Sequence, residues 1–136
     1  MTNGEKPFEQ LWNELFWYFD GMTIVTHNAA FDCSALRSTL DASNLDYPDF
    51  DYHCTLRLAQ EILPLESHTL DAVSKYFKIK LQHHNAESDA KAAALIAIKL
   101  CERFIMDSLE ELSSVLGFKT GKIFSNTKSY RPFKKK

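Results

Sequence analysis

Residues 27–32, with the sequence HNAAFD, bring a His, an Asn and an Asp together directly behind the strand-forming run GMTIVT. We expect Asn28 to cap a helix that begins here, so that Asp32 lies in its first turn and points across the end of the strand. His27 takes either a structural hydrogen-bonding role at the strand end or a direct role in the chemistry. The segment therefore predicts a functional site at the strand-to-helix junction.

A second polar segment, HHNAESDA at residues 83–90, has the same character. Asn85 is the expected cap of a long helix, which places Asp89 near its first turn and His84 in the loop before it. A carboxylate on a rigid helix can hold a hard cation, and a neighbouring loop histidine can take a proton from water. His83, its neighbour in the loop, is the alternative for that second role. Together the two segments indicate metal-dependent hydrolysis.

The rest of the sequence predicts the elements that position these segments. Apolar residues at helical spacing alternate with two short strand-like runs, which predicts an α/β fold whose helices cover the strands. Two strands alone make a marginal sheet, so we expect strands to be missing from this pattern. The predicted elements are a helix from Pro7 to Gly21, a strand over 22–26, a helix from Asn28 past Leu40, a strand over 52–56, and helices over 57–63, 69–77, 85–100 and 107–117.

Composition points to one domain in a reducing compartment. The chain has 136 residues, of which 45% are hydrophobic and 12% aromatic, enough for a single core. Its three cysteines show no CxxC spacing, which argues against a disulfide framework or a zinc site and favours the cytoplasm. The longest apolar run, AAALIAI, is too short to cross a bilayer, so no membrane association is expected. The aromatic stripe of residues 8–19 is predicted to be core, because its spacing is helical.

The charge is divided unevenly along the chain. Residues 1–112 carry 9 Lys and Arg against 18 Asp and Glu, whereas residues 113–136 carry 7 Lys and Arg and no acidic residue. We therefore divide the chain into a domain over 1–117 and a basic tail or linker over 118–136. The interleaved aromatic residues of this tail suit phosphate contact with base stacking, and a solvated linker is the equally acceptable alternative.

The two polar segments and the sequence between them resemble the DEDDh 3′–5′ exonucleases, a DnaQ-like family of the ribonuclease-H-like superfamily that includes the epsilon subunit of DNA polymerase III. HNAAFD is similar to the second motif of the family, and the third motif, His-x4-Asp, is similar to His84 through Asp89. The resemblance covers about residues 7–117. It implies that Asp32 and Asp89 are ligands of two Mg²⁺ or Mn²⁺ ions and that His84 is the general base that activates water.

His27, Asn28 and Phe31 are candidates for substrate binding, and the resemblance implies that Phe31 occupies a scaffold position next to the ligand Asp32. The implied substrate is the 3′ end of a DNA or RNA strand, and a DNA polymerase is an implied partner. The alternative function is that of a degenerate exonuclease fold kept as a module that binds nucleic acid or a polymerase.

One part of the family pattern is missing. The first motif, Asp-x-Glu on the first strand, does not occur in residues 1–136, and the Asp-x-Asp of residues 49–51 lies in a scaffold stretch. We therefore expect an incomplete ribonuclease-H-like fold that lacks its N-terminal strands, in a shortened chain without detectable activity of its own. Such a chain would leave one side of its sheet exposed, which predicts self-association.

Overall fold

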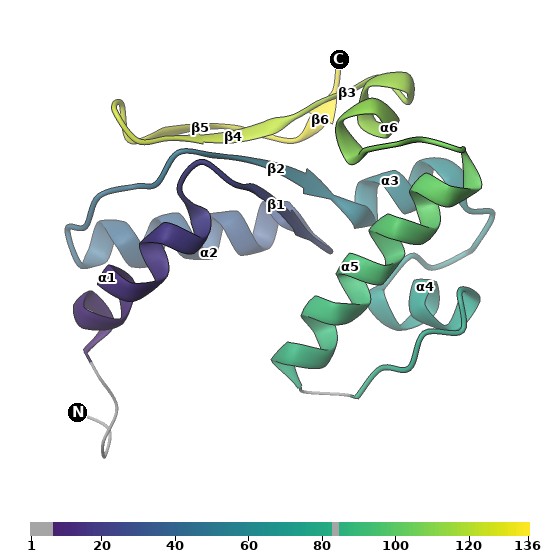
Figure 1. The fold of residues 1–136 in the computed structure, drawn as a ribbon, viewed down its shortest axis with the longest axis horizontal. Coiled ribbons are helices and arrows are strands. Elements are labelled where there is room, and N and C mark those ends of the chain that lie inside the picture. Colours follow the sequence, from purple (N-terminus) through teal and green to yellow (C-terminus); the bar gives the residue numbers. More distant parts are fainter. Residues whose placement is uncertain (1–6, 83–84) are drawn as a thin grey trace.

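The computed structural model describes residues 7–82 and 85–136. It is a mixed α/β structure (Figure 1), as predicted. The helices are α1 (Phe8–Phe19), α2 (Ala29–Ala42), α3 (Thr55–Ile62), α4 (Leu70–Tyr76), α5 (Ala86–Arg103) and α6 (Leu109–Val115). The strands are β1 (Thr23–Thr26), β2 (Phe50–Cys54), β3 (Phe118–Lys119), β4 (Gly121–Phe124), β5 (Ser129–Arg131) and β6 (Lys134–Lys135).

The main sheet has four strands in the order β1-β2-β4-β5, and β3 pairs with β6 in a separate two-stranded ribbon. β1 and β2 are parallel and in register from Thr23 opposite Asp51 to Thr26 opposite Cys54. The carboxyl ends of both strands therefore lie at the same end of the sheet, and α2 and α3 begin there. This end of the sheet positions the polar segment of residues 27–32.

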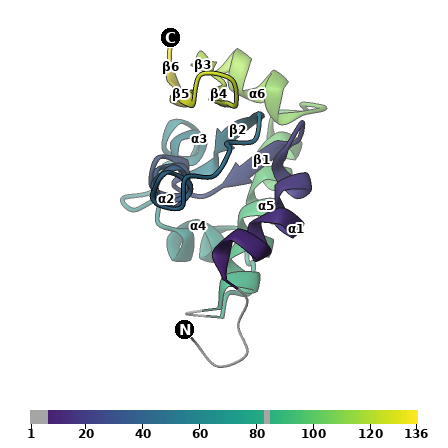
Figure 2. The same ribbon diagram turned by 90° about the vertical axis from the view of Figure 1, so that its left-hand side faces the viewer.

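Helices cover both faces of the parallel pair. In Figures 1 and 2, α2 lies on one side of β1 and β2, and α5 lies on the other. The core between these layers is made mostly of large apolar side chains with less than a tenth of their surface exposed. Its largest members include Trp12, Phe50, Tyr52, Leu58, Ile96, Leu100 and Leu112. Trp12 confirms that the aromatic stripe of α1 contributes to the core.

The basic segment 118–136, expected as a tail or linker, forms strands instead. β4 runs antiparallel to β2, with Phe50 opposite Ile123 and Tyr52 opposite Gly121. Ile123 and Phe133 are buried, so this segment contributes apolar surface to the core. A Cβ atom at position 121 would lie 2.4 Å from the Tyr52 ring, which is why a glycine is needed where β4 crosses that ring.

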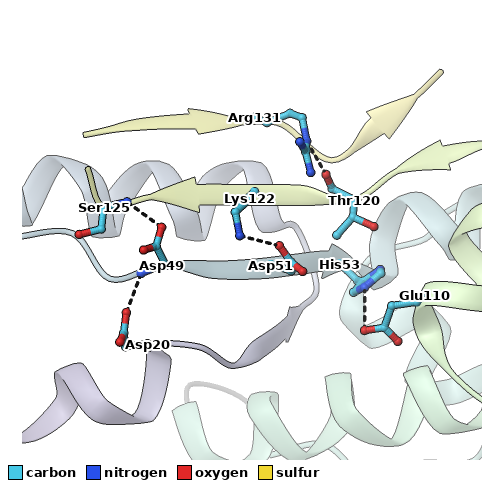
Figure 3. A network of polar contacts seen from close by, with 9 residues as sticks. All are labelled: Asp20, Asp49, Asp51, His53, Glu110, Thr120, Lys122, Ser125 and Arg131. Atoms are coloured by element: carbon cyan, nitrogen blue, oxygen red, sulfur yellow. Dashed lines mark hydrogen bonds and ion pairs between the residues drawn. The ribbon is translucent and has the colours of Figure 1, made fainter. Parts of the chain in front are cut away.

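β4 and β5 pair antiparallel as a hairpin. Polar contacts connect this hairpin to β2 (Figure 3). Lys122 Nζ lies 3.3 Å from Asp51 Oδ1, and the backbone N–H of Ser125 donates to Asp49 Oδ1 at 2.9 Å. The backbone N–H of Asp49 in turn donates to Asp20 Oδ1 at 2.9 Å, which ties the end of α1 to the sheet. Asp49 and Asp51 therefore have scaffold contacts, as their place in the sequence indicated.

β1 forms an edge of the main sheet among the described residues. Beside it runs an apolar groove of about 480 Å³ between β1, α5 and the residues that lead into α6; Val25, Ala97, Ile98 and Met106 are among its lining residues. Ile98 is 53% exposed. No helix among the described residues is long and apolar enough to span a bilayer.

Candidate active site at the ends of β1 and α5

The junction between β1 and α2 is a tight left-handed turn. Asn28 has φ 79°, in the left-handed region that Asn tolerates better than most residues. Its carbonyl oxygen accepts hydrogen bonds from the backbone N–H groups of Phe31 and Asp32, at 3.2 and 3.3 Å. Asn28 is the residue that precedes α2, as predicted, but its side chain makes no capping hydrogen bond. The turn therefore works through the backbone, and it places Asp32 in the first turn of α2.

The Asp32 carboxylate accepts a hydrogen bond from the Thr26 hydroxyl. Thr26 is the last residue of β1, so the strand end and the first helical turn hold this carboxylate between them. Thr26 was not among the residues singled out in the sequence. The signal that could have found it is a hydroxyl side chain at the end of the strand that leads into the HNAAFD segment.

Asp89 lies in the first turn of α5. The side-chain oxygen of Asn85 accepts the backbone N–H of Ser88 at 3.0 Å, which confirms Asn85 as the helix cap. The backbone N–H of Asp89 donates to the Asn85 carbonyl at 3.0 Å. Capping fixes the start of the helix, so the position of Asp89 follows from a rigid element.

Asp32 and Asp89 line one cavity. Its volume is about 370 Å³, and its wall is formed by the end of β1, the first turn of α2, the start of α4 and the first turns of α5. The lining residues are Val25, Thr26, His27, Asp32, Leu70, Ala86, Asp89, Ala90 and Ala93. The structure thus brings together the two carboxylates that the sequence placed in separate motifs. Small side chains from α5 leave the space between them open.

His27 also borders this cavity, but both of its ring nitrogens are occupied. Nδ1 lies 2.8 Å from the Thr55 hydroxyl oxygen, and Nε2 lies 2.7 Å from the carbonyl oxygen of His68, to which it must donate. Burial lowers the pKa of His27, although the hydrogen bond to His68 acts in the opposite direction. In this geometry His27 joins the end of β1 to the start of α3 and to the loop before α4. The arrangement corresponds to the structural role considered for it.

The remaining candidates lie elsewhere. Phe31 is 67% exposed and does not line the cavity that holds Asp32 and Asp89. Asn28 borders a different cavity, on the other side of the α2 start. The predicted general base, His84, lies outside the described residues. Its role stays a prediction, as do the substrate-binding roles of Phe31 and Asn28.

The carboxylate set is small for a divalent cation. Mg²⁺ prefers near-octahedral coordination by oxygen, and a two-ion site needs several carboxylates in one small volume. Within residues 7–82 and 85–136, no group of three or more His, Cys, Asp or Glu side chains is placed to hold a metal ion. Asp32 and Asp89 suit part of such a site, but they do not make a complete one.

A sheet with helices on both faces, and with helix-borne carboxylates at the carboxyl end of its parallel strands, is the arrangement of a ribonuclease-H-like nuclease domain. Residues 1–97 match the family described as Exonuclease (RNase_T). The chain belongs to this exonuclease family, which confirms the resemblance drawn from its motifs.

Individual relatives agree with this assignment. The chain is 30% identical over 105 residues to the 3′-5′ exonuclease DinG of Bacillus subtilis, a match that covers 76% of this chain and 11% of DinG. It is 33% identical over 121 residues to the PolC-type DNA polymerase III of Caldanaerobacter subterraneus, covering 85% of this chain and 9% of that polymerase. The PolC-type DNA polymerase III of Thermotoga petrophila is 28% identical over 121 residues, covering 88% of this chain and 9% of that polymerase.

The chain therefore spans only about a tenth of the length of these curated relatives. No solved structure matches it.

Proposed function

We propose that this chain supplies the second and third motifs of a DEDDh 3′–5′ exonuclease domain, which removes nucleotides from the 3′ end of a DNA or RNA strand. The observation that carries the proposal is the convergence of Asp32 and Asp89 on one cavity. The two residues come from distant parts of the sequence and from two separate helices, and both are held at helix starts. Membership of the exonuclease family supports the same reading.

In this proposal Asp32 and Asp89 would supply some of the ligands of two Mg²⁺ or Mn²⁺ ions. Such ions supply a water nucleophile at neutral pH and stabilise the leaving oxygen. The residues of this chain have their own tasks. Thr26 orients the Asp32 carboxylate, His27 fixes the end of β1, and His84 takes a proton from water. Because two carboxylates leave a two-ion site incomplete, we propose that these 136 residues alone do not hydrolyse nucleic acid.

A second candidate function is a binding module that retains the fold without the chemistry. The small carboxylate set and the fully bonded His27 favour it. Restoration of the missing carboxylates separates the two functions, because only a domain that keeps the remaining catalytic residues in place would regain activity.

The names of the relatives suggest which enzyme this domain acts beside. Two of them are polymerases of the PolC type, so we propose that this domain acts beside a DNA polymerase on the 3′ end of the strand. We further propose that a second copy of the chain covers the edge of β1 and the apolar groove beside it, because an unpaired edge next to exposed apolar side chains favours pairing.

The test of the exonuclease function is a gain of activity. A strand-forming segment that bears Asp-x-Glu is fused before residue 7, and release of single nucleotides from a 5′-labelled oligonucleotide is measured with Mg²⁺ or Mn²⁺. We expect no release by the original chain and stepwise release from the 3′ end by the fusion. A matched fusion with Asn-x-Gln controls for the added strand, and Asp89→Asn and His84→Ala in the active fusion should each abolish release. An inactive fusion that folds and binds the oligonucleotide would support the binding module instead.

A further inference from the structure

A second cavity lies on the other side of the start of α2. Its volume is about 300 Å³, and it is bounded by α2, by the first residues of α3 and by the segment that follows β4. Two arginines, Arg37 and Arg57, line it together with Ser34, Tyr130 and Phe133, and no Asp or Glu is among its lining residues. In a domain whose first 112 residues are strongly acidic, this absence of carboxylates makes the cavity a local basic site.

Arg37 is held in place by an aromatic ring. Its guanidinium carbon lies 3.5 Å from the centroid of the Tyr130 ring, which is close stacking. Ser34 precedes Arg37 by one helical turn and lines the same cavity. Neither Arg37 nor Arg57 forms an ion pair with a carboxylate among the described residues. The two guanidinium groups are therefore available to an external anion.

The cavity is adjacent to the candidate active site. Asn28 lines the arginine cavity, whereas His27, its neighbour in the chain, lines the cavity of Asp32 and Asp89. Ala30 and Ser34 of α2 line the arginine cavity, whereas Asp32, from the same part of the helix, lines the other. Phe31 stands exposed at this start of α2. A polynucleotide whose 3′ end enters the carboxylate cavity could thus continue across this part of α2.

We propose that Arg37 and Arg57 bind a backbone phosphate of a single-stranded substrate, upstream of its 3′-terminal nucleotide. The planar guanidinium fork matches the geometry of phosphate oxygens, and the half-exposed Tyr130 ring offers a surface on which a base can stack. The inference rests on the proposed function, because it takes the carboxylate cavity as the place of the 3′ end. It adds an interaction that positions the strand and takes no part in the chemistry.

The test measures binding without hydrolysis. Fluorescence anisotropy follows a 5′-labelled oligothymidylate with the 136-residue chain in EDTA, for the original protein and for Arg37→Gln and Arg57→Gln. Removal of one charge-assisted hydrogen bond should weaken binding on the order of tenfold. It should also lower the slope of log affinity against log salt by about 0.7 for each phosphate that the variant no longer neutralises. Lys91→Gln is the matched control, since the Lys91 side chain is 72% exposed and lies beside Glu87 on α5; it should leave affinity unchanged.

Two further measurements complete the test. Ser34→Asp places a carboxylate in the cavity wall without removing the stacked Arg37, and it should weaken binding as the arginine variants do. Competition by inorganic phosphate and by thymidine monophosphate separates a strand site from a site for free phosphate. We expect neither to compete at concentrations where a longer unlabelled oligonucleotide does.

Three results would overturn the proposal: unchanged affinity in both arginine variants, an equal weakening in Lys91→Gln, or tight competition by phosphate alone. Because the binding measurement needs no turnover, it can be interpreted even if the exonuclease assay shows no activity. Conversely, an active fusion with unchanged binding in the arginine variants would refute this inference alone.

Discussion

The Thr26 hydroxyl donates a hydrogen bond to the Asp32 carboxylate, so the last residue of β1 orients a side chain in the first turn of α2. In Thr26→Val the carboxylate loses this partner but keeps its charge. We expect weak binding of Mn²⁺ by the original chain, weaker binding by Thr26→Val, and loss of binding by Asp32→Asn. Paramagnetic broadening of amide resonances around the cavity measures this. Asp46→Asn, an exposed carboxylate outside the cavity, is the control, and equal broadening in all four proteins would contradict the prediction.

His53 predicts how stability depends on pH. The ring is fully buried in β2, with Nδ1 2.8 Å from the Ser113 hydroxyl oxygen and Nε2 3.8 Å from Glu110 Oε1. Burial lowers its pKa below the ordinary value of 6.5, and the charges of Glu110 and Asp51 only partly oppose this.

Between pH 6.5 and the lowered pKa, His53 therefore binds a proton in the unfolded chain but not in the folded chain. The free energy of unfolding should be highest above pH 6.5 and should fall as the pH drops from 6.5 toward the lowered pKa of folded His53. The lowered pKa of His27 has an effect of the same sign. Urea denaturation at about pH 8 and about pH 5 measures the difference, which His53→Gln should reduce. If His53→Gln loses as much stability between these two pH values as the original chain does, groups other than His53 cause the effect.

Gly121 predicts a stability effect at the join between β2 and β4. In Gly121→Ala the new methyl group would meet the Tyr52 ring, which is buried between α2 and the hairpin. Overpacking of this kind costs about 1–3 kcal/mol, so we expect a lower free energy of unfolding by that amount. Asn126→Ala, in the exposed turn between β4 and β5, should change it little. Equal stability of the two variants would show that β4 does not pack on Tyr52.

The basic residues of the C-terminal segment should strengthen binding to single-stranded nucleic acid. Removal of residues 119–136 is a poor test, because it would also remove the buried Ile123 and Phe133. Neutralisation of Lys119, Lys134 and Lys136, which are exposed, leaves the core intact. We expect the triple Gln variant to bind an oligonucleotide more weakly and with a shallower salt dependence. An unchanged salt slope in anisotropy measurements would show that these lysines make no phosphate contacts.

The edge of β1 predicts self-association. If a second copy covers this edge and the neighbouring groove, Ile98→Glu should place a charge in the contact and yield monomers. Sedimentation velocity at micromolar concentrations compares it with the original chain, for which we expect a dimer or a larger species. Glu87→Lys, an exposed change at the opposite end of α5, is the control. A well-folded monomer of the original chain would refute the prediction.

Local signals predicted much of this structure. The cap at Asn85 follows from a side chain that bonds to the nearby backbone, and it is present. The convergence of Asp32 and Asp89 follows from two helix starts at one end of the sheet. The second strand runs over Phe50–Cys54 instead of 52–56. It ends earlier because α3 begins at Thr55, and it begins earlier because Phe50 and Asp51 pair with Ile123 and Lys122 of β4.

Long-range contacts explain what the sequence did not predict. β4 and β5 are short and rich in basic residues, and the need for Gly121 becomes apparent only once the Tyr52 ring lies opposite it. His27 likewise bonds to Thr55, which is 28 positions away in the sequence, and to His68, which is 41 positions away. The stacking of Arg37 on Tyr130 depends on the same distant pairing, so the arginine cavity had no local signature.

The pairing of β4 with β2 also bears on the order of folding. Lys122 and Asp51, which meet across these strands, are 71 residues apart in the sequence. Closure of a loop of that length costs more entropy than the local pairing of β4 with β5, so the hairpin should form first and dock afterwards. Until it docks, β2 has an open edge of its own, and the chain is most prone to aggregate in that interval. Refolding should therefore show a late phase that Gly121→Ala slows, while the helical signal recovers early.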